Sequence, residues 1–254
     1  MAEFSYGSAR VTGMSHRNVN QPCQDSINLK VIDADKDKYL VMAVADGHGH
    51  RQHDLSATGS KLATASAVEV AEFGIRKYGN AYLDRFNETF ANDVCHSWSQ
   101  RILEDSMIRG IQFDPVRYGT TLTTAIMYGN TIVIGKIGDG SVVVKTGNDS
   151  IVLWAEDEEI RSNRTSSLCQ IDAITRFEFE RIDDCGGVLL ATDGLVNSLP
   201  SFKNLETILE YFLCQLSSSA LSTGVEHAIW GLAEQCAVGG ACDDTTIVAA
   251  MPIK

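Results

Sequence analysis

The segment Tyr39–His50, YLVMAVADGHGH, decides the fold, because it joins an apolar run directly to an acid and a glycine-rich turn. Leu40–Ala45 is typical of a buried strand, and Asp46 and Gly47 follow it at once. An Asp-Gly pair is common in ordinary turns, so this pair has little weight by itself. Its weight comes from the repetition of the same pattern elsewhere in the chain.

Three further apolar runs adjoin an acid in the same way. GKIGDGS contains Asp139, VLLATDGL contains Asp193, and ACDDTTIVAA places Asp243 and Asp244 before its strand. Acids at strand ends can meet at one rim of a sheet-based domain, where like charges repel unless cations neutralise them. The sequence therefore predicts a metal site at such a rim.

The kind of metal follows from the kind of ligand. Carboxylates without a cluster of Cys or His ligands favour Mg²⁺ or Mn²⁺ over zinc. His50 and His53 lie close to the first acid and suggest zinc as an alternative. No matching set of cysteines or acids accompanies them, so we expect them to be solvated histidines.

Composition limits the class of protein. The chain has 254 residues, of which 44% are hydrophobic, and only four prolines, so we expect one domain over residues 1–254 with a sizeable core. The formal net charge of −12 argues against nucleic acid or an anionic membrane as the main partner. Seven cysteines without a C-x-x-C pair, no signal-peptide pattern and no run of membrane-spanning length predict a cytoplasmic protein.

The order of strands and helices predicts the fold class. Expected strands cover residues 4–11, 26–32, 40–45, 120–128, 131–137, 142–145, 151–154, 177–182, 187–192 and 246–251, and expected helices cover residues 55–77, 81–107, 205–216 and 219–236. Adjacent hairpins favour antiparallel pairing over a doubly wound parallel sheet. We therefore predict an α+β fold: a four-layer α-β-β-α sandwich of two mainly antiparallel sheets flanked by helical pairs.

Three stretches receive more specific expectations. The helix over residues 81–107 should pack one stripe into the core, comprising Leu83, Phe86, Phe90, Val94, Trp98, Ile102 and Leu103. Residues 155–174 are acidic and then polar, and should cover a sheet edge or the site. The polar segment 12–25 contains three chemically able residues, His16, Arg17 and Asp25.

Five motifs occur in an order that resembles a known family. They are Asp46-Gly47-His48-Gly49, Gly119-Thr120-Thr121, Gly138-Asp139-Gly140-Ser141, Thr192-Asp193-Gly194-Leu195 and Asp243-Asp244-Thr245-Thr246. The series resembles the metal-dependent type 2C Ser/Thr protein phosphatases, the PPM family. It is most similar to compact, atypical bacterial members that carry a Pro-Cys-Gln-Asp segment near the N-terminus, here Pro22 to Asp25.

The resemblance implies two Mn²⁺ or Mg²⁺ ions at one end of a β-sandwich, with a possible third. Asp46 matches the acid that bridges both ions, and the carbonyl of Gly47 would bind one of them. Asp193 and Asp243 match the acids that hold the other ion. Asp139 matches a position that helps a third, weaker ion in some members.

Two further acids match positions behind the ligands. Asp25 matches an acid that reaches metal-bound water. At the place of Asp244 the family more often has Asn, so we expect this residue to lie behind the ligands and to tolerate Asn.

The chemistry that the resemblance implies is hydrolysis without a phosphoenzyme. A hydroxide bridging the two ions would attack phosphorus in line. His48 would act as general acid and protonate the leaving Ser or Thr oxygen. The alternative is that His48 is an ordinary residue of an exposed glycine turn.

The arginine that binds phosphate in the family is the point of departure. It stands in Arg-x-x-Asn-Glu/Gln-Asp, and Arg17 fits the first place, but Asp25 arrives three residues late. Either Arg17 serves across a short insertion, or another cation such as Arg10 or Arg51 does. Arg17 can equally be a surface residue.

Three functions are consistent with these residues. The first is a protein phosphatase acting on phosphoserine and phosphothreonine, with a phosphoprotein substrate and an opposing Ser/Thr kinase as partners. The second is a pseudophosphatase that binds or regulates a partner, which the displaced arginine leaves open. The third is a metal hydrolase of small phosphoesters or nucleotides.

Overall fold

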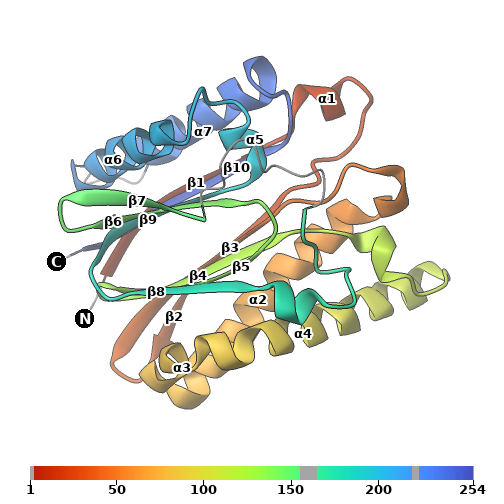
Figure 1. Cartoon of the computed structure of the whole chain (residues 1–254), viewed down its shortest axis with the longest axis horizontal. Helices are drawn as coiled ribbons and strands as arrows, with labels where there is room; N and C mark the ends of the chain where they lie inside the picture. The colour runs from red at the N-terminus through yellow and green to blue at the C-terminus, as the bar shows by residue number, and fades with distance from the viewer. Residues whose placement is uncertain (1–2, 155–164, 219–222, 254) are drawn as a thin grey trace.

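Two five-stranded antiparallel sheets pack face to face, and helices cover the outer face of each sheet (Figure 1). The computed structural model describes residues 3–154, 165–218 and 223–253. This architecture confirms the predicted α+β class and the order of four layers. None of the described helices is both long enough and apolar enough to cross a membrane.

The first sheet has the strand order β2-β3-β4-β5-β8. Its strands are β2 (Ser26–Ala34), β3 (Asp37–Ala45), β4 (Leu122–Tyr128), β5 (Thr131–Ile137) and β8 (Glu178–Ile182). Tyr128 pairs with Thr131, so Gly129 and Asn130 form the two-residue hairpin that the sequence predicts. Gly129 has a φ of 54°, which a glycine adopts without strain.

The second sheet has the strand order β1-β10-β9-β6-β7. Its strands are β1 (Glu3–Val11), β10 (Thr245–Ile253), β9 (Cys185–Ala191), β6 (Ser141–Thr146) and β7 (Asp149–Leu153). β1 pairs with β10 alone, so the strand expected over residues 4–11 lies at the edge of this sheet. The first and last strands of the chain are therefore neighbours, and this brings residues 12–25 close to the residues that precede β10.

Strand β3, which leads directly to Asp46, is buried on both faces. Leu40, Met42 and Val44 pack in the core between the two sheets. The alternate residues of β3 pack on the other face, in the core that the sheet forms with its helices. Because both faces are covered, β3 is a continuous apolar run, as its sequence predicts.

Two pairs of long helices form the outer layers. Helices α2 (Ser56–Tyr78) and α4 (Phe86–Arg109) cover the first sheet, and α6 (Lys203–Ser218) and α7 (Thr223–Gly239) cover the second (Figure 1). Ala63, Ala67 and Ala71 of α2 are fully buried, so small side chains pack this helix closely. The short helices are α1 (Met14–Arg17), α3 (Asn80–Asp84) and α5 (Asp193–Val196).

The prediction of one helix over residues 81–107 is wrong in detail. Arg85 leaves the helical conformation, with φ −114° and ψ 12°, and divides the segment into α3 and α4. The ring of Tyr82, in α3, lies against Gly74 of α2, where there is no room for a Cβ atom. The predicted stripe is buried as expected, except that Leu103 is 39% exposed.

Candidate active site

Four acidic side chains reach one cleft from the two sheets. Asp46 follows β3 and Asp139 follows β5 in the first sheet, and Asp193 follows β9 in the second. Asp243 comes two residues before β10 in the second sheet. All four line a cleft with a volume of about 1030 Å³. The structure therefore brings together the acids that the sequence places at strand ends.

Asp46 is held in place by the two threonines of the Gly-Thr-Thr motif. The backbone N–H of Asp46 donates to Oγ1 of Thr121 at 2.9 Å. The carbonyl of Asp46 accepts from the N–H of Thr121 and from Oγ1 of Thr120, each at 2.8 Å. These bonds fix the direction in which the chain leaves β3, and with it the place of the carboxylate.

Gly47 is a position where the backbone passes very close to its neighbours. Its N–H donates to the carbonyl of Gln24 at 3.1 Å. A Cβ atom at this position would lie 2.7 Å from the carbonyl oxygen of Gln24 and 2.8 Å from that of Ser56. Only glycine fits, which is the physical reason for the Asp-Gly order at the end of β3.

The acids of the cleft raise one another's pKa. Burial raises the pKa of Asp46 well above its usual range, and the negative charges of Asp25, Asp193, Asp139 and Asp243 raise it further. Burial is also the main reason that the pKa of Asp193 rises to about 6. Without a compensating cation, these carboxyl groups bind protons more tightly in the folded chain than in the unfolded chain.

The carboxylates surround a common space without converging on one point. Among the described residues, no group of three or more His, Cys, Asp and Glu side chains is arranged closely enough to hold a metal ion. Mg²⁺ and Mn²⁺ sites are commonly built from one or two carboxylates and several waters, so a tight ring of protein ligands is not required. The oxygen donors therefore fit such an ion in type, and water would complete its coordination.

Asp25 lies behind the cleft and is fully enclosed. Its Oδ2 accepts from Oγ1 of Thr192 at 2.8 Å and from Oγ1 of Thr246 at 2.7 Å. No described group hydrogen-bonds to its Oδ1, although that atom is buried. Burial raises the pKa of Asp25 to about 8. A buried acceptor without a partner suits a bound water or cation at this place.

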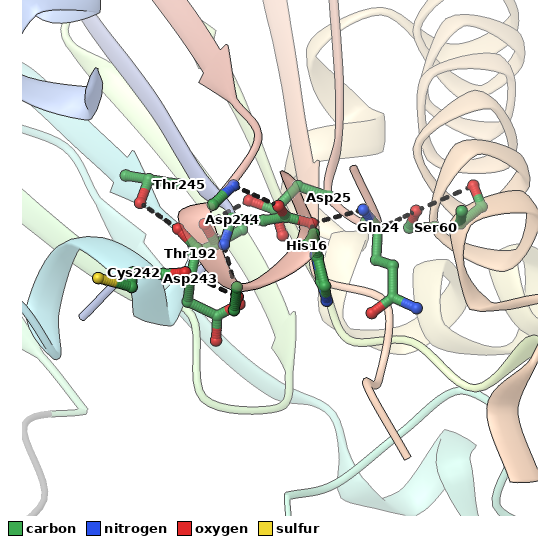
Figure 2. A network of polar contacts seen from close by, with 12 residues as sticks. His16, Gln24, Asp25, Ser60, Thr192, Cys242, Asp243, Asp244 and Thr245 are labelled. Atoms are coloured by element: carbon green, nitrogen blue, oxygen red, sulfur yellow. Dashed lines mark hydrogen bonds and ion pairs between the residues drawn. The ribbon is translucent and has the colours of Figure 1, made fainter. Parts of the chain in front are cut away.

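Asp244 binds the polar segment that follows β1 (Figure 2). Its Oδ1 accepts from the N–H of Gly13 at 2.7 Å, and its Oδ2 accepts from the N–H of Gln24 at 2.6 Å and from Nδ1 of His16 at 2.9 Å. The residue is 3% exposed and does not line the cleft, whereas Asp243 does. Of the two adjacent acids, the first faces the cleft and the second ties the chain behind it.

The three histidines after β3 have different environments. His48 lines the cleft, and burial lowers its pKa to about 4, so its imidazole is neutral at pH 7. His50 is exposed, as expected. The expectation of a solvated His53 is wrong: the residue is buried, with Nδ1 hydrogen-bonded to the carbonyl of Val116 and Nε2 to Gln52.

The structure does not bring Arg17 into the cleft. Its guanidinium donates to both carboxylate oxygens of Glu234, at 3.0 and 2.9 Å, on the side of helix α7. Arg10 donates to the backbone carbonyl of Asp25 at 3.1 Å. Neither arginine is among the described residues that line the cleft, and Arg51 is not among them either.

The segment after β7 forms part of the cleft wall. Oγ1 of Thr165 donates to Oδ2 of Asp139 at 2.7 Å, and Ser167 is hydrogen-bonded to the backbone of Thr120. This agrees with the expectation that residues 155–174 cover the site, although residues 155–164 lie outside the described part of the chain. The wall continues to Arg176, whose Nε donates to Asp172 at 2.7 Å.

Sequence reasoning assigned no role to several residues of the cleft. His16, Gln24 and Arg176 all line it. His16 and Gln24 come from the polar segment before β2, which reaches the cleft because Asp244 holds it there. Arg176 lies in a short turn, Ala173–Arg176, whose sequence carries no functional pattern.

Comparisons with known proteins agree on one family and one fold. A sequence profile of the family described as Protein phosphatase 2C matches residues 12–229. A search of curated protein sequences found no match. Similar solved structures include PppA of Pseudomonas aeruginosa, a key regulatory component of T6SS, with 17% identity, a TM-score of 0.64 and 98% of each chain covered.

Two further structures are similar over nearly their whole length. The catalytic domain of the serine/threonine phosphatase PstP, in complex with two manganese ions, has 18% identity and a TM-score of 0.65, with all of each chain covered. The serine/threonine phosphatase of S. agalactiae has 16% identity and a TM-score of 0.67, with 98% of this chain and 99% of that chain covered. At such identities the likeness establishes the fold.

Proposed function

The chain belongs to the protein phosphatase 2C family, and on that premise we propose that it is a metal-dependent phosphatase of phosphoserine and phosphothreonine in proteins. The observation that carries the proposal is the acidic cleft. Asp46, Asp139, Asp193 and Asp243 line it from both sheets, and the pKa of Asp46 and that of Asp193 are raised by burial and by the negative charges of their neighbours. Divalent cations would offset this repulsion.

The residues would divide between two Mn²⁺ or Mg²⁺ ions and a possible third. Asp46 and the carbonyl of Gly47 would hold one ion, with Asp46 shared between both, and Asp193 and Asp243 would hold the second. Asp139 would serve the third. Bound there, the ions would supply Lewis acidity, which lowers the pKa of water and offsets charge on a phosphate ester.

Asp25 is proposed to orient water rather than to bind a cation directly. Its Oδ2 is occupied by two threonine hydroxyls, and only Oδ1 is without a described partner. A carboxylate held in this way presents one acceptor in a fixed direction. It can therefore accept a hydrogen bond from a water molecule in the cleft and keep that molecule aligned.

His48 is proposed to donate a proton toward the leaving oxygen. Its backbone N–H donates to the carbonyl of Gly119 at 3.1 Å, which fixes the residue at the cleft wall. The neutral ring can donate one N–H hydrogen bond. A phosphate dianion that binds nearby raises the pKa of the ring, because it favours the charged imidazolium.

The pairing of Arg17 favours a second candidate, a pseudophosphatase that acts by binding. The guanidinium that matches the family's phosphate-binding arginine is engaged by Glu234 and lies outside the cleft. If no other group binds phosphate, turnover would be weak and the cleft would serve recognition. The acids of the cleft favour the enzyme.

The proposal extends to partners and place of action. A phosphoprotein would be the substrate, and a Ser/Thr kinase would supply it. All seven cysteines are free, which suits a reducing compartment such as the cytoplasm. We also propose that residues 1–254 act as one domain.

The test is hydrolysis of a phosphothreonine peptide with Mn²⁺, with Mg²⁺ and with a chelator. We expect activity with either ion and none with the chelator, and we expect Asp46→Asn and Asp193→Asn to abolish it. Asp183→Asn is the matched control, since Asp183 bonds to Thr131, at the opposite end of β5 from Asp139. Undiminished activity in excess chelator would refute metal dependence, and Mn²⁺ binding without turnover would favour the pseudophosphatase.

A further inference from the structure

His16 lies at the wall of the cleft, and its ring nitrogen Nε2 takes no part in the proposed metal binding or proton transfer. The residue belongs to α1 and lines the cleft together with Asp46, Asp193 and Asp243. Its side chain is 13% exposed. A mostly buried imidazole at the wall of an acidic cleft can act on whatever binds there.

The backbone around His16 is firmly held. The N–H and the Oγ of Ser15 both donate to the carbonyl of Cys242, at 3.0 and 2.7 Å. The N–H of Gly13 donates to Asp244 at 2.7 Å. These bonds fix the segment to the residues that precede β10, so His16 presents its ring from a rigid support.

Asp244 determines which edge of the ring faces the cleft (Figure 2). A carboxylate only accepts, so Nδ1 of His16 is the donor in the 2.9 Å contact with Oδ2 of Asp244. Nε2 stands on the other edge of the ring and is directed away from Asp244. In the part of the chain that the structure describes, no hydrogen bond to Nε2 is present.

Of the other basic groups at or near the cleft, His48 is assigned to the leaving oxygen, and three more are engaged elsewhere. Arg17 is bound to Glu234, and Arg176 to Asp172. His53 uses both ring nitrogens. A phosphate ester that enters a cleft lined by acids needs donors, and the Nε2 edge of His16 is placed to provide one.

Resting on the proposed function, we propose that Nε2 of His16 binds a phosphoryl oxygen of the substrate. In the imidazolium form of a histidine, both ring nitrogens donate. Nδ1 then donates to Asp244 and Nε2 to the phosphate, so the cation lies between two anions. His16 thus supplies the contact that Arg17 does not make.

Two substitutions separate the two edges of the ring. In His16→Asn, the side-chain amide can replace the Nδ1 donor to Asp244, but nothing reaches the place of Nε2. In His16→Gln, the longer amide can reach the place of Nε2, but the bond to Asp244 is lost. Arg176→Gln is a comparison variant that removes a different cation from the cleft.

The probe is inorganic phosphate, titrated by calorimetry into the Mn²⁺-loaded full chain, with Mn²⁺ binding measured separately. We expect His16→Asn to weaken phosphate binding roughly 10- to 100-fold, the usual effect of losing a hydrogen bond to a charged group. Its Mn²⁺ binding should stay within about two-fold of the unsubstituted chain, since a lost ligand typically costs far more. His16→Gln should keep more of the phosphate affinity, even though its melting temperature falls.

Phosphate binding that is unchanged in His16→Asn would overturn the inference, as would loss in Arg176→Gln alone. A parallel loss of Mn²⁺ and phosphate would also overturn it, because His16 would then support the whole site. If His16→Asn does not fold, His16→Gln decides: a loss of phosphate binding in proportion to the loss of Mn²⁺ binding refutes a phosphate contact.

If the unsubstituted chain binds no Mn²⁺, the proposed function fails and this inference fails with it. If the unsubstituted chain hydrolyses phosphopeptide normally and His16→Asn binds phosphate as tightly as that chain does, this inference alone fails.

Discussion

Asp244→Asn should destabilise the fold, although the family resemblance suggests that Asn is tolerated there. The carboxylate accepts from Gly13, Gln24 and His16, and it is buried. An Asn side chain keeps one acceptor oxygen, so the bond from Gly13 can persist. Its NH₂ group then faces the N–H of Gln24, and two donors cannot bond to each other.

The size of the effect follows from the number of donors left without a partner. His16 can move its proton to Nε2 and accept from the new amide, which leaves Gln24 as the one unpaired donor. A buried donor without a partner costs about 1–3 kcal/mol. A chain of this length loses about 2–4 °C in melting temperature for each kcal/mol, so we expect a fall of about 4–8 °C for 2 kcal/mol.

The assay is thermal unfolding in chelator, so that metal binding does not contribute. Glu234→Gln is the matched control, because it also replaces a hydrogen-bonded acid by its amide, but at a residue that is 29% exposed. An exposed ion pair contributes about 0–1 kcal/mol, so the control should change little. If Asp244→Asn and Glu234→Gln have the same melting temperature, the three hydrogen bonds of Asp244 do not hold the segment as argued.

Three further predictions address the titration, the proton donor and the packing. In chelator, the melting temperature should fall as pH rises from 3.8 to about 8. The raised pKa of Asp25 means that the folded chain binds the proton of this group more tightly than the unfolded chain does. A melting temperature that rises over that pH range would contradict the burial argument. His48→Gln should slow phosphopeptide hydrolysis roughly 10²-fold but p-nitrophenyl phosphate hydrolysis much less, since nitrophenolate leaves without a proton; equal slowing would indicate a different role. Gly59→Ala should cost about 1–3 kcal/mol in an unfolding assay, because its Cβ would lie 2.0 Å from the carbonyl oxygen of Tyr118. Gly224→Ala is its control, with nothing within 4 Å, and similar losses in both would refute the steric argument.

Much of the fold is predictable because its signals are local. The continuous apolar run of β3 reflects a strand covered on both faces, and the alanines of α2 reflect a helix packed closely on a sheet. The Gly129–Asn130 turn requires a positive φ at Gly129, and the glycine in the sequence indicates it. The positions of the acids are predictable for the same reason: each adjoins a strand, and in an antiparallel sheet the end of one strand lies at the same rim as the start of its neighbour.

The contacts of individual side chains at the rim could not be predicted from the sequence. Asp243 and Asp244 are adjacent and chemically identical, yet one faces the cleft and the other binds Gly13, Gln24 and His16. No local period distinguishes them, because the strand begins only after both. The difference exists because β1 pairs with β10, which brings the segment after β1 against the residues that precede β10.

The same pairing decides which cations reach the site. Arg17 and His16 are neighbours in the sequence, and the resemblance favoured the arginine. In the folded chain Arg17 turns to Glu234 on α7, while His16 turns to Asp244 and the cleft. The sequence by itself determined the strands, the helices and the acids at their ends, because neighbouring residues carry those signals. Only the tertiary structure decided which side chains meet across more than 200 residues, because those contacts depend on the packing of whole elements.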